Sequence, residues 1–208
     1  MNVLAGAGKP VIGIVGGIGA GKSAVAAELA AMGCVLIDAD RVGHEMLGRA
    51  DARREIRQRW GDGVFGPDGN VDRKALAKRV FADPDELVAL NGILHPLMRR
   101  RMAARIADAQ ADPSAAGVAL DAAVLFEAGW DDLCTHTVFV SAPASQRFAR
   151  VAATRGWTRA EWKKREKTQI SLDTKAARCD SILENRTSAS YLREQVRELF
   201  HRICPSGF

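Results

Sequence analysis

An eight-residue segment near the start of the chain, Gly16–Ser23, reads GGIGAGKS and fits the pattern G-x-x-x-x-G-K-[ST]. The segment before it, Val11–Val15, is apolar and rich in β-branched residues, which predicts a buried strand. The segment after it, Ser23–Met32, has apolar residues at helical spacing, which predicts a helix that Gly33 ends. A glycine-rich turn without any ligand is the alternative, but the full pattern between a strand and a helix favours a phosphate-binding loop.

The chemistry of such a loop follows from its residue types. Glycines let the backbone approach a ligand closely, so that loop and first-turn N–H groups converge on an anion. Lys22 is expected to reach the β- and γ-phosphates of ATP, and the Ser23 hydroxyl to meet Mg²⁺ directly or through water. We therefore expect ATP to bind at Gly17, Ile18, Gly19, Ala20, Gly21, Lys22, Ser23 and Ala24.

Composition limits the remaining possibilities. The 208 residues suffice for one good-sized core and a small inserted lobe. The apolar runs are shorter than the ~20 residues of a membrane span, and no secretory signal is visible, so we expect a cytoplasmic protein with no membrane partner. The four cysteines are scattered, which predicts reduced thiols and no zinc site. The net charge of +5 suits polyanionic ligands, but basic and acidic residues are interleaved, which argues against nucleic-acid binding. No oligomeric state is indicated.

Two carboxylates follow the second expected strand, Cys34–Ile37, namely Asp38 and Asp40. Ligands of open parallel sheets sit outside the carboxyl ends of strands, so these side chains are placed to meet a substrate hydroxyl or a metal ion. If the extended backbone continues, both side chains share one face. The alternative is that Asp40 only caps a helix over 41–47.

The stretch 51–112 is mainly helical in pattern. We expect helices over 52–60 and 72–81, a turn-rich loop over 61–70, and a helix from Pro84 that breaks or kinks near Pro96. A further helix goes on to about residue 109. This insertion resembles an acceptor-binding lobe or a lid. Its His95 is either a ligand or a packed structural histidine.

The rest of the chain alternates strands and helices. A third strand is expected over 118–126, where Asp121 and Glu127 are both candidates for the carboxylate that meets Mg²⁺. A fourth strand is expected over 137–140. The helix that Pro143 opens carries Arg147, Arg150 and Arg155, one or two of which would neutralise a transferring phosphoryl group, as in a cationic lid.

A capping box, Thr158–Glu161, begins a helix expected to run toward residue 177, with Arg165 and Gln169 on one face. A last strand over 180–184 and a helix over 188–203 complete the pattern. Strands that alternate with helices predict an α/β fold of the P-loop nucleoside triphosphate hydrolase type, with a parallel sheet of about five strands flanked by helices. We expect one domain, residues 1–208, with a core of 10–50, 116–142 and 179–208, a helical insertion at 51–112 and a lid at 143–178.

Taken together, the ordered motifs resemble the dephospho-CoA kinase family. The resemblance rests on the loop, on Ile37–Asp40, Phe65–Gly69, Val71–Arg73, Leu94–Pro96, Val124–Glu127, the lid arginines with Gln169, and the strand that ends at Asn185. It implies phosphorylation of the ribose 3′-hydroxyl of dephospho-CoA by ATP. It also implies that Asp40 receives the hydroxyl proton, that Lys22 and Arg150 act in catalysis and that Asn185 joins Arg150 at the ATP site. The residues implied to bind dephospho-CoA are Asp38, Asp40, Arg73, His95 and Glu127.

Two other functional interpretations are compatible with the same loop. A GTPase-like switch finds some support in Asp40–Gly43, which fits D-x-x-G, but this motif follows the loop too soon and the chain has no N-K-x-D guanine motif. A kinase for another small metabolite, such as a nucleoside or sugar acid, would keep the loop and the lid and change only the acceptor.

Overall fold

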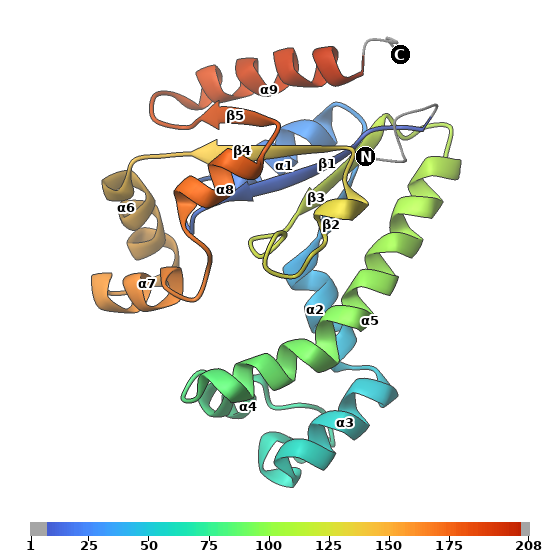
Figure 1. Cartoon of the computed structure of the whole chain (residues 1–208), viewed down its shortest axis with the longest axis vertical. Helices are drawn as coiled ribbons and strands as arrows, with labels where there is room; N and C mark the ends of the chain where they lie inside the picture. Colours follow the sequence, from blue (N-terminus) through green and yellow to red (C-terminus); the bar gives the residue numbers. More distant parts are fainter. Residues whose placement is uncertain (1–7, 205–208) are drawn as a thin grey trace. The chain divides into compact units, whose positions relative to one another are not determined.

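The computed structural model describes residues 8–204 (Figure 1). The strands are β1 Val11–Gly16, β2 Cys34–Asp38, β3 Gly117–Asp121, β4 His136–Ser141 and β5 Ser181–Glu184. The α-helices are α1 Lys22–Ala31, α2 Ala39–Leu47, α3 Ala50–Trp60, α4 Arg73–Val80, α5 Pro84–Ala111, α6 Ala144–Arg155, α7 Arg159–Glu166, α8 Leu172–Arg178 and α9 Ala189–Ile203. Short 3₁₀ turns span Asp62–Val64 and Asp131–Leu133.

The five strands form one parallel sheet in the order β2-β3-β1-β4-β5. The expected parallel sheet of about five strands is therefore confirmed. The strand β1, which leads into the glycine-rich loop, lies at the centre, and all six of its residues are buried. A parallel sheet covered on both faces needs such continuous apolar strands.

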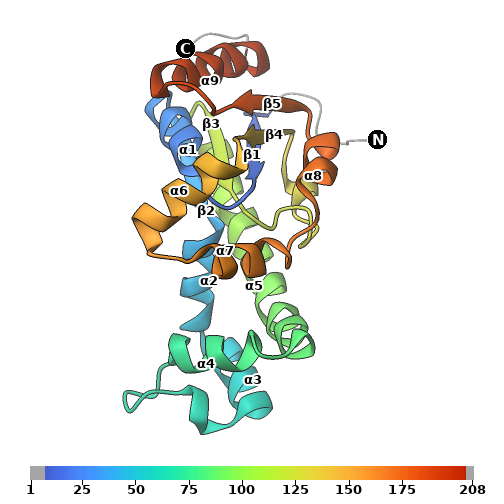
Figure 2. The ribbon, with the colours of Figure 1, turned by 90° about the vertical axis from the view of Figure 1, so that its left-hand side faces the viewer.

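Helices cover both faces of this sheet, with α1 and α8 on opposite sides (Figure 2). One core cluster joins α1 and α9 to the sheet through Ile12, Ile14, Val25, Leu29, Ala119, Val138, Val196 and Leu199. The apolar stripe expected in the last helix is part of this core. On the other face, a Cβ at Gly13 would meet Leu125 and Cys134, so the backbone of β1 packs closely there against the loop after β3.

The chain divides into two compact units. One holds the described residues up to Asp38 and from Arg105 onward, and the other is Ala39–Ala104. The second unit has its own small core, in which Ile56, Val64, Leu76 and Val80 are buried. The finer division into core, insertion and lid stays a prediction. Within the described part of the chain, none of the helices combines the length and the apolar character that a membrane crossing requires.

Three expectations about element boundaries were wrong. The strand expected over 118–126 ends at Asp121, and residues 123–129 form turns instead. These turns are apolar because Leu125 and Phe126 are buried against the protein interior rather than paired in the sheet. Buried turns and buried strands have the same apolar composition, so the sequence pattern could not separate them.

The helix expected over 161–177 is two helices, α7 and α8. The chain breaks between them because Ser171 caps α8 by accepting the Thr174 N–H at 3.0 Å. Gln169 therefore lies outside a helix and does not share a helical face with Arg165. The capping box at Thr158 and Glu161 is present as expected.

Near Pro96 we expected a break or a kink. The helix α5 does not break but runs from Pro84 to Ala111 with Pro96 inside it, and it bends partway along its length (Figure 1). The helix after β2 begins at Ala39, not after Asp40. Asp40 therefore lies in the first helical turn, neither capping the helix nor continuing the strand beside Asp38.

Candidate active site

The glycine-rich loop connects the carboxyl end of β1 to the first residue of α1, Lys22. Gly19 and Gly21 have φ angles of +81° and +101°, a region that favours glycine. Ala20 N–H donates to the Gly17 carbonyl at 3.0 Å, which closes the turn. Gly21 is the N-cap of α1 and supplies no side-chain cap, so the helix N-terminus is open to an anionic partner. The Lys22 ammonium lies 3.3 Å from the Gly16 carbonyl oxygen, folded back over the loop.

Asn185, the residue directly after β5, contacts this loop. Its side-chain nitrogen donates to the Ala20 carbonyl at 2.8 Å, and the residue is buried. A Cβ on Gly21 would overlap the same amide nitrogen. The glycine is therefore required both by its backbone angle and by the neighbouring side chain.

Arg150 of α6 also binds the loop. Its Nη1 donates to the carbonyls of Gly19 and Ala20, both at 3.2 Å, and its Nη2 donates to the Asn185 carbonyl at 3.1 Å. Arg150 and Asn185 thus hold the carbonyl side of the loop, which leaves the N–H side for a phosphate. The structure brings these two residues and the loop together.

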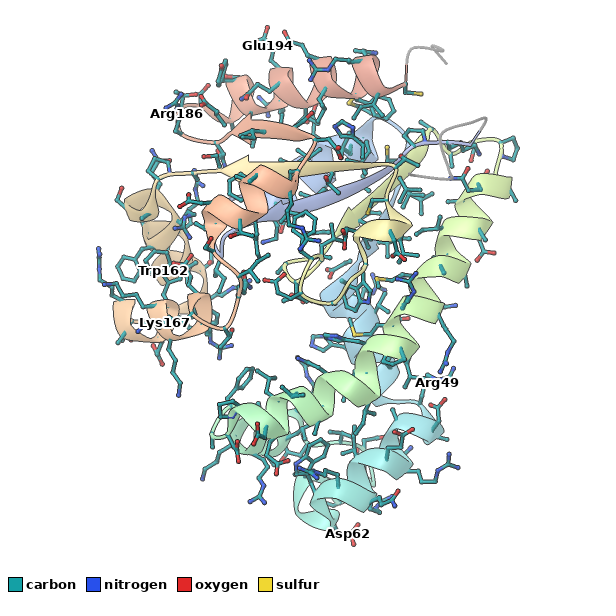
Figure 3. All side chains as sticks on the ribbon, viewed as in Figure 1. Arg49, Asp62, Trp162, Lys167, Arg186 and Glu194 are labelled. Carbon is teal, nitrogen blue, oxygen red and sulfur yellow. The ribbon has the colours of Figure 1, made fainter. Side chains whose placement is uncertain are left out.

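Arg147 and Arg155, the other two arginines of α6, have different surroundings. Arg147 is only 5% exposed and pairs with Glu166 of α7 while lying over the Trp162 ring at 5.0 Å. Figure 3 shows Trp162 between α6 and α7, where its ring also meets Phe148 at 5.7 Å. Arg155 lies over the Trp157 ring instead. Arg147 therefore joins α6 to α7, and a Cβ on Gly17 would come within 2.6 Å of its Nη1.

Asp38 and Asp121 end the neighbouring strands β2 and β3, and their Cα atoms are register partners. Side chains alternate along a strand, so these carboxylates share the face of Cys34 and Ala119, which belong to the same core cluster as α1. The helix α1, which follows the glycine-rich loop, packs on this face of the sheet. Two carboxylates side by side at this edge suit a cation or a hydroxyl.

Glu127 belongs to a different group. Its Oε1 lies 2.9 Å from the Lys175 ammonium and accepts the Ile170 N–H at 3.1 Å. Its Oε2 is buried and has no hydrogen-bond partner. The sequence offered Asp121 and Glu127 as alternative candidates for the carboxylate that meets Mg²⁺. The structure places them in different environments.

Three predicted site residues belong to the unit Ala39–Ala104. Asp40 is exposed in the first turn of α2, where the helix dipole favours its negative charge. Arg73 begins α4 and its Nη2 lies 2.7 Å from His44 Nε2. His95 lies within α5, and burial lowers the pKa of its imidazole, which favours the neutral form near pH 7.

Sequence reasoning did not single out Lys175, Glu166 or Trp162 as site residues. Each lies in a stretch rich in charged residues, a pattern typical of a solvated helix. Only the tertiary packing reveals that Lys175 is fully buried. No local signal could have separated it from Lys163 or Lys164.

Comparisons with known proteins agree with this geometry. Residues 10–190 match the family model for dephospho-CoA kinase. A dephospho-CoA kinase of Symbiobacterium thermophilum is 37% identical over 195 residues, covering 93% of this chain and 81% of that protein. A crystal structure of a Thermus thermophilus protein superposes with a TM-score of 0.78 at 34% identity, covering 93% of this chain and 98% of that one. A shikimate kinase of Acinetobacter baumannii, at 16% identity and a TM-score of 0.56, covers 95% of this chain and 96% of its own and shares the fold.

Proposed function

Because the chain belongs to the dephospho-CoA kinase family, whose members phosphorylate dephospho-CoA with ATP in the last step of coenzyme A biosynthesis, we propose that it transfers the γ-phosphoryl group of ATP to the ribose 3′-hydroxyl of dephospho-CoA. The observation that carries the proposal is the loop of Gly16–Gly21 between the buried β1 and the uncapped N-terminus of α1. Phosphoryl transfer relies mainly on positioning and on charge stabilisation, which such a loop supplies.

The nucleotide is held by the loop. The backbone N–H groups of the loop face the phosphates, apart from those of Ala20 and Ala24, which donate to the Gly17 and Gly21 carbonyls at 3.0 Å. Lys22 leaves its contact with the Gly16 carbonyl to reach the β- and γ-phosphates. Arg150 and Asn185 complete the ATP site. Arg150 donates to four acceptors, including Gln146, so it contacts a phosphoryl group by exchanging one of these bonds.

The residues at the carboxyl edge of the sheet fit Mg²⁺. This ion prefers oxygen ligands and is held by one or two carboxylates together with substrate phosphates. Among residues 8–204 no group of three or more His, Cys, Asp or Glu side chains forms a metal site by itself, so a metal that arrives with ATP suits the chain better than a resident one. We assign it to Ser23, directly or through water, with Asp38 or Asp121 nearby. Bound there, Mg²⁺ would neutralise charge on the β- and γ-phosphates.

Asp40 acts as the proton acceptor for the ribose hydroxyl. Asp40 is exposed in the first turn of α2, so its carboxylate is available to a substrate. Asp38 lies two residues earlier at the end of β2 and binds the same part of the acceptor. In the Ala39–Ala104 unit, Arg73 suits an acceptor phosphate, and neutral His95 suits a hydroxyl or an amide.

A test uses the purified full chain with Mg-ATP and a panel of acceptors: dephospho-CoA, nucleosides, gluconate and shikimate. We expect ADP release to depend on dephospho-CoA alone, with the new phosphate located on the 3′-oxygen by phosphorus NMR. Turnover of another acceptor at a comparable rate would overturn the substrate assignment. A preference for GTP with no dependence on any acceptor would point instead to a GTPase-like switch.

A further inference from the structure

Lys175 of α8 is a fully buried lysine in the part of the chain that the structure describes, with 0% of its surface exposed. Its ammonium makes two hydrogen bonds and one ion pair. The partners are the Ala123 carbonyl at 2.7 Å, Gln169 Oε1 at 2.9 Å and Glu127 Oε1 at 2.9 Å. A buried ammonium costs much desolvation free energy unless it is paired and hydrogen-bonded, and here it is both.

These contacts tie two separate segments together. Ala123 and Glu127 lie at the start and near the end of the turns that follow β3, whereas Gln169 and Lys175 flank the N-terminus of α8. The Ile170 N–H adds a second bond to Glu127 Oε1 at 3.1 Å. Lys175 therefore sets where the segment directly after Asp121 lies.

Among the described residues, only one of the two carboxylate oxygens of Glu127 has a bonding partner. Oε1 accepts the Ile170 N–H and is paired with the Lys175 ammonium, while Oε2 is buried without a hydrogen-bond partner. Buried polar atoms in native proteins nearly always have a partner, so such an exception needs an explanation. The Glu127 side chain remains 17% exposed, which places it at the boundary with solvent. The last torsion of a glutamate side chain is soft, so a small rotation would present Oε2 to a ligand.

We propose that Lys175 is a positioning residue that holds the Glu127 carboxylate through Oε1, so that Oε2 accepts a hydrogen bond from a donor group on the bound acceptor substrate. The inference deepens the proposed function and rests on it. A carboxylate oxygen repels phosphates, so the donor it takes is a hydroxyl, amino or amide N–H group of dephospho-CoA rather than a part of the triphosphate. Lys175 itself touches no substrate.

A second ion pair between the same segments provides a matched control. Arg178, also on α8, donates to Asp131 at 3.1 Å and lies over the Phe126 ring at 4.1 Å. Arg178 attaches α8 to the stretch after β3 through Asp131 and Phe126 rather than through Glu127. If α8 merely needs to be attached, Lys175 and Arg178 variants should behave alike. If Glu127 must be held, only the Lys175 variant should affect the acceptor.

The experiment compares the parent chain with Lys175→Met, Glu127→Gln, the double variant and Arg178→Gln. For each, kcat, the KM for dephospho-CoA, the KM for ATP and the melting temperature are measured. We expect Lys175→Met and Glu127→Gln each to raise the KM for dephospho-CoA about tenfold, the scale of one lost charged hydrogen bond, with the KM for ATP within about twofold. The double variant should be no worse than either single one, because both act through one oxygen. Arg178→Gln should keep both KM values.

Equal changes in the two KM values, independent effects that multiply in the double variant, or an unchanged KM for dephospho-CoA in folded Lys175→Met would each overturn the proposal. Lys175→Met leaves a buried carboxylate without its cation, which costs folding stability. If this variant does not fold, the double variant, which removes that charge as well, decides the outcome. If neither Lys175→Met nor the double variant folds, an unchanged KM for dephospho-CoA in Glu127→Gln overturns the proposal. A parent chain that does not use dephospho-CoA would instead refute the proposed function.

Discussion

The Cα atoms of Asp38 and Asp121 are paired in register across the neighbouring parallel strands β2 and β3. Because their side chains lie on the face that carries α1, the two carboxylates and the Ser23 hydroxyl belong to the same side of the sheet. This relationship separates them from Glu127, whose carboxylate is bonded to Lys175 and Ile170. We propose that these strand ends lie near the metal, with Asp38 also within reach of the acceptor, and that Glu127 meets the acceptor.

The first prediction concerns the metal requirement. Asp121→Asn and Asp38→Asn should each raise the Mg²⁺ concentration needed for half-maximal activity by about tenfold or more, since residues that orient a bound metal typically contribute this much. The measurement is a Mg²⁺ titration of the rate at fixed ATP. Asp173→Asn, at an exposed position in α8, is the control and should keep the parental curve. If both strand-end variants gave the parental Mg²⁺ titration curve, the metal would bind elsewhere.

A second prediction concerns the loop lysine. Lys22→Met keeps most of the side-chain length but removes the charge that stabilises the transferring phosphoryl group, so kcat/KM for ATP should fall at least about a hundredfold. Nucleotide affinity, measured by calorimetry, should fall as well. Lys163→Met changes an exposed lysine of α7 and should have little effect. A Lys22→Met enzyme with parental affinity and rate would contradict the placement of this residue.

A third prediction concerns the proton acceptor. Asp40→Asn should keep ATP affinity but lower kcat by about 10²–10⁴-fold, the usual contribution of a positioned general base. The change keeps the size of the side chain, so the melting temperature should fall by only a few degrees. Steady-state kinetics and ATP titration separate the two effects. Turnover near the parental rate would show that Asp40 serves the first turn of α2 and not the reaction.

A fourth prediction concerns the fit between Gly21 and Asn185. Gly21→Ala adds a Cβ that overlaps the Asn185 amide and places alanine at a φ of +101°, so both the melting temperature and ATP affinity should fall. Gly156→Ala is the control, because Gly156 has a φ of +65° with nothing within 4 Å of the added atom. That variant should lose only about 1–2 kcal/mol of stability from backbone strain. Equal losses in the two variants would argue against the clash with Asn185.

A fifth prediction concerns pH. Burial lowers the pKa of His95 below its usual 6.5, so the unfolded chain binds a proton that the folded chain resists. The stability that depends on neutral His95 is therefore fully present above pH 6.5 and is lost as the pH falls through the lowered pKa. The melting temperature should drop between pH 7.5 and pH 5.5, and His95→Gln should reduce that drop. Burial also lowers the pKa of His136, so part of the drop should persist in this variant. An identical drop in parent and variant would contradict the prediction.

The elements predicted best from the sequence are those whose signals are local. The loop, the strands β1, β2, β4 and β5, and the capping box at Thr158 each depend on residues close together in the chain. The errors arose where an apolar or helical pattern continued past the true end of an element. Whether Ala122–Phe126 pairs in the sheet or turns beneath it depends on partners that are distant in sequence, which no periodicity encodes.

The glycine-rich loop, its lysine and serine, and the alternation of strands and helices were determined by the sequence alone, because backbone freedom at glycine and the spacing of apolar residues act over a few neighbouring positions. Only the tertiary structure decided that Arg150 and Asn185 hold the loop carbonyls, that Asp38 stands beside Asp121, and that Lys175 is buried against Glu127. The physical reason is that strand order and charge burial arise from packing between residues far apart in the chain. A lysine in a charged helix has the same local sequence whether it meets water or a buried carboxylate.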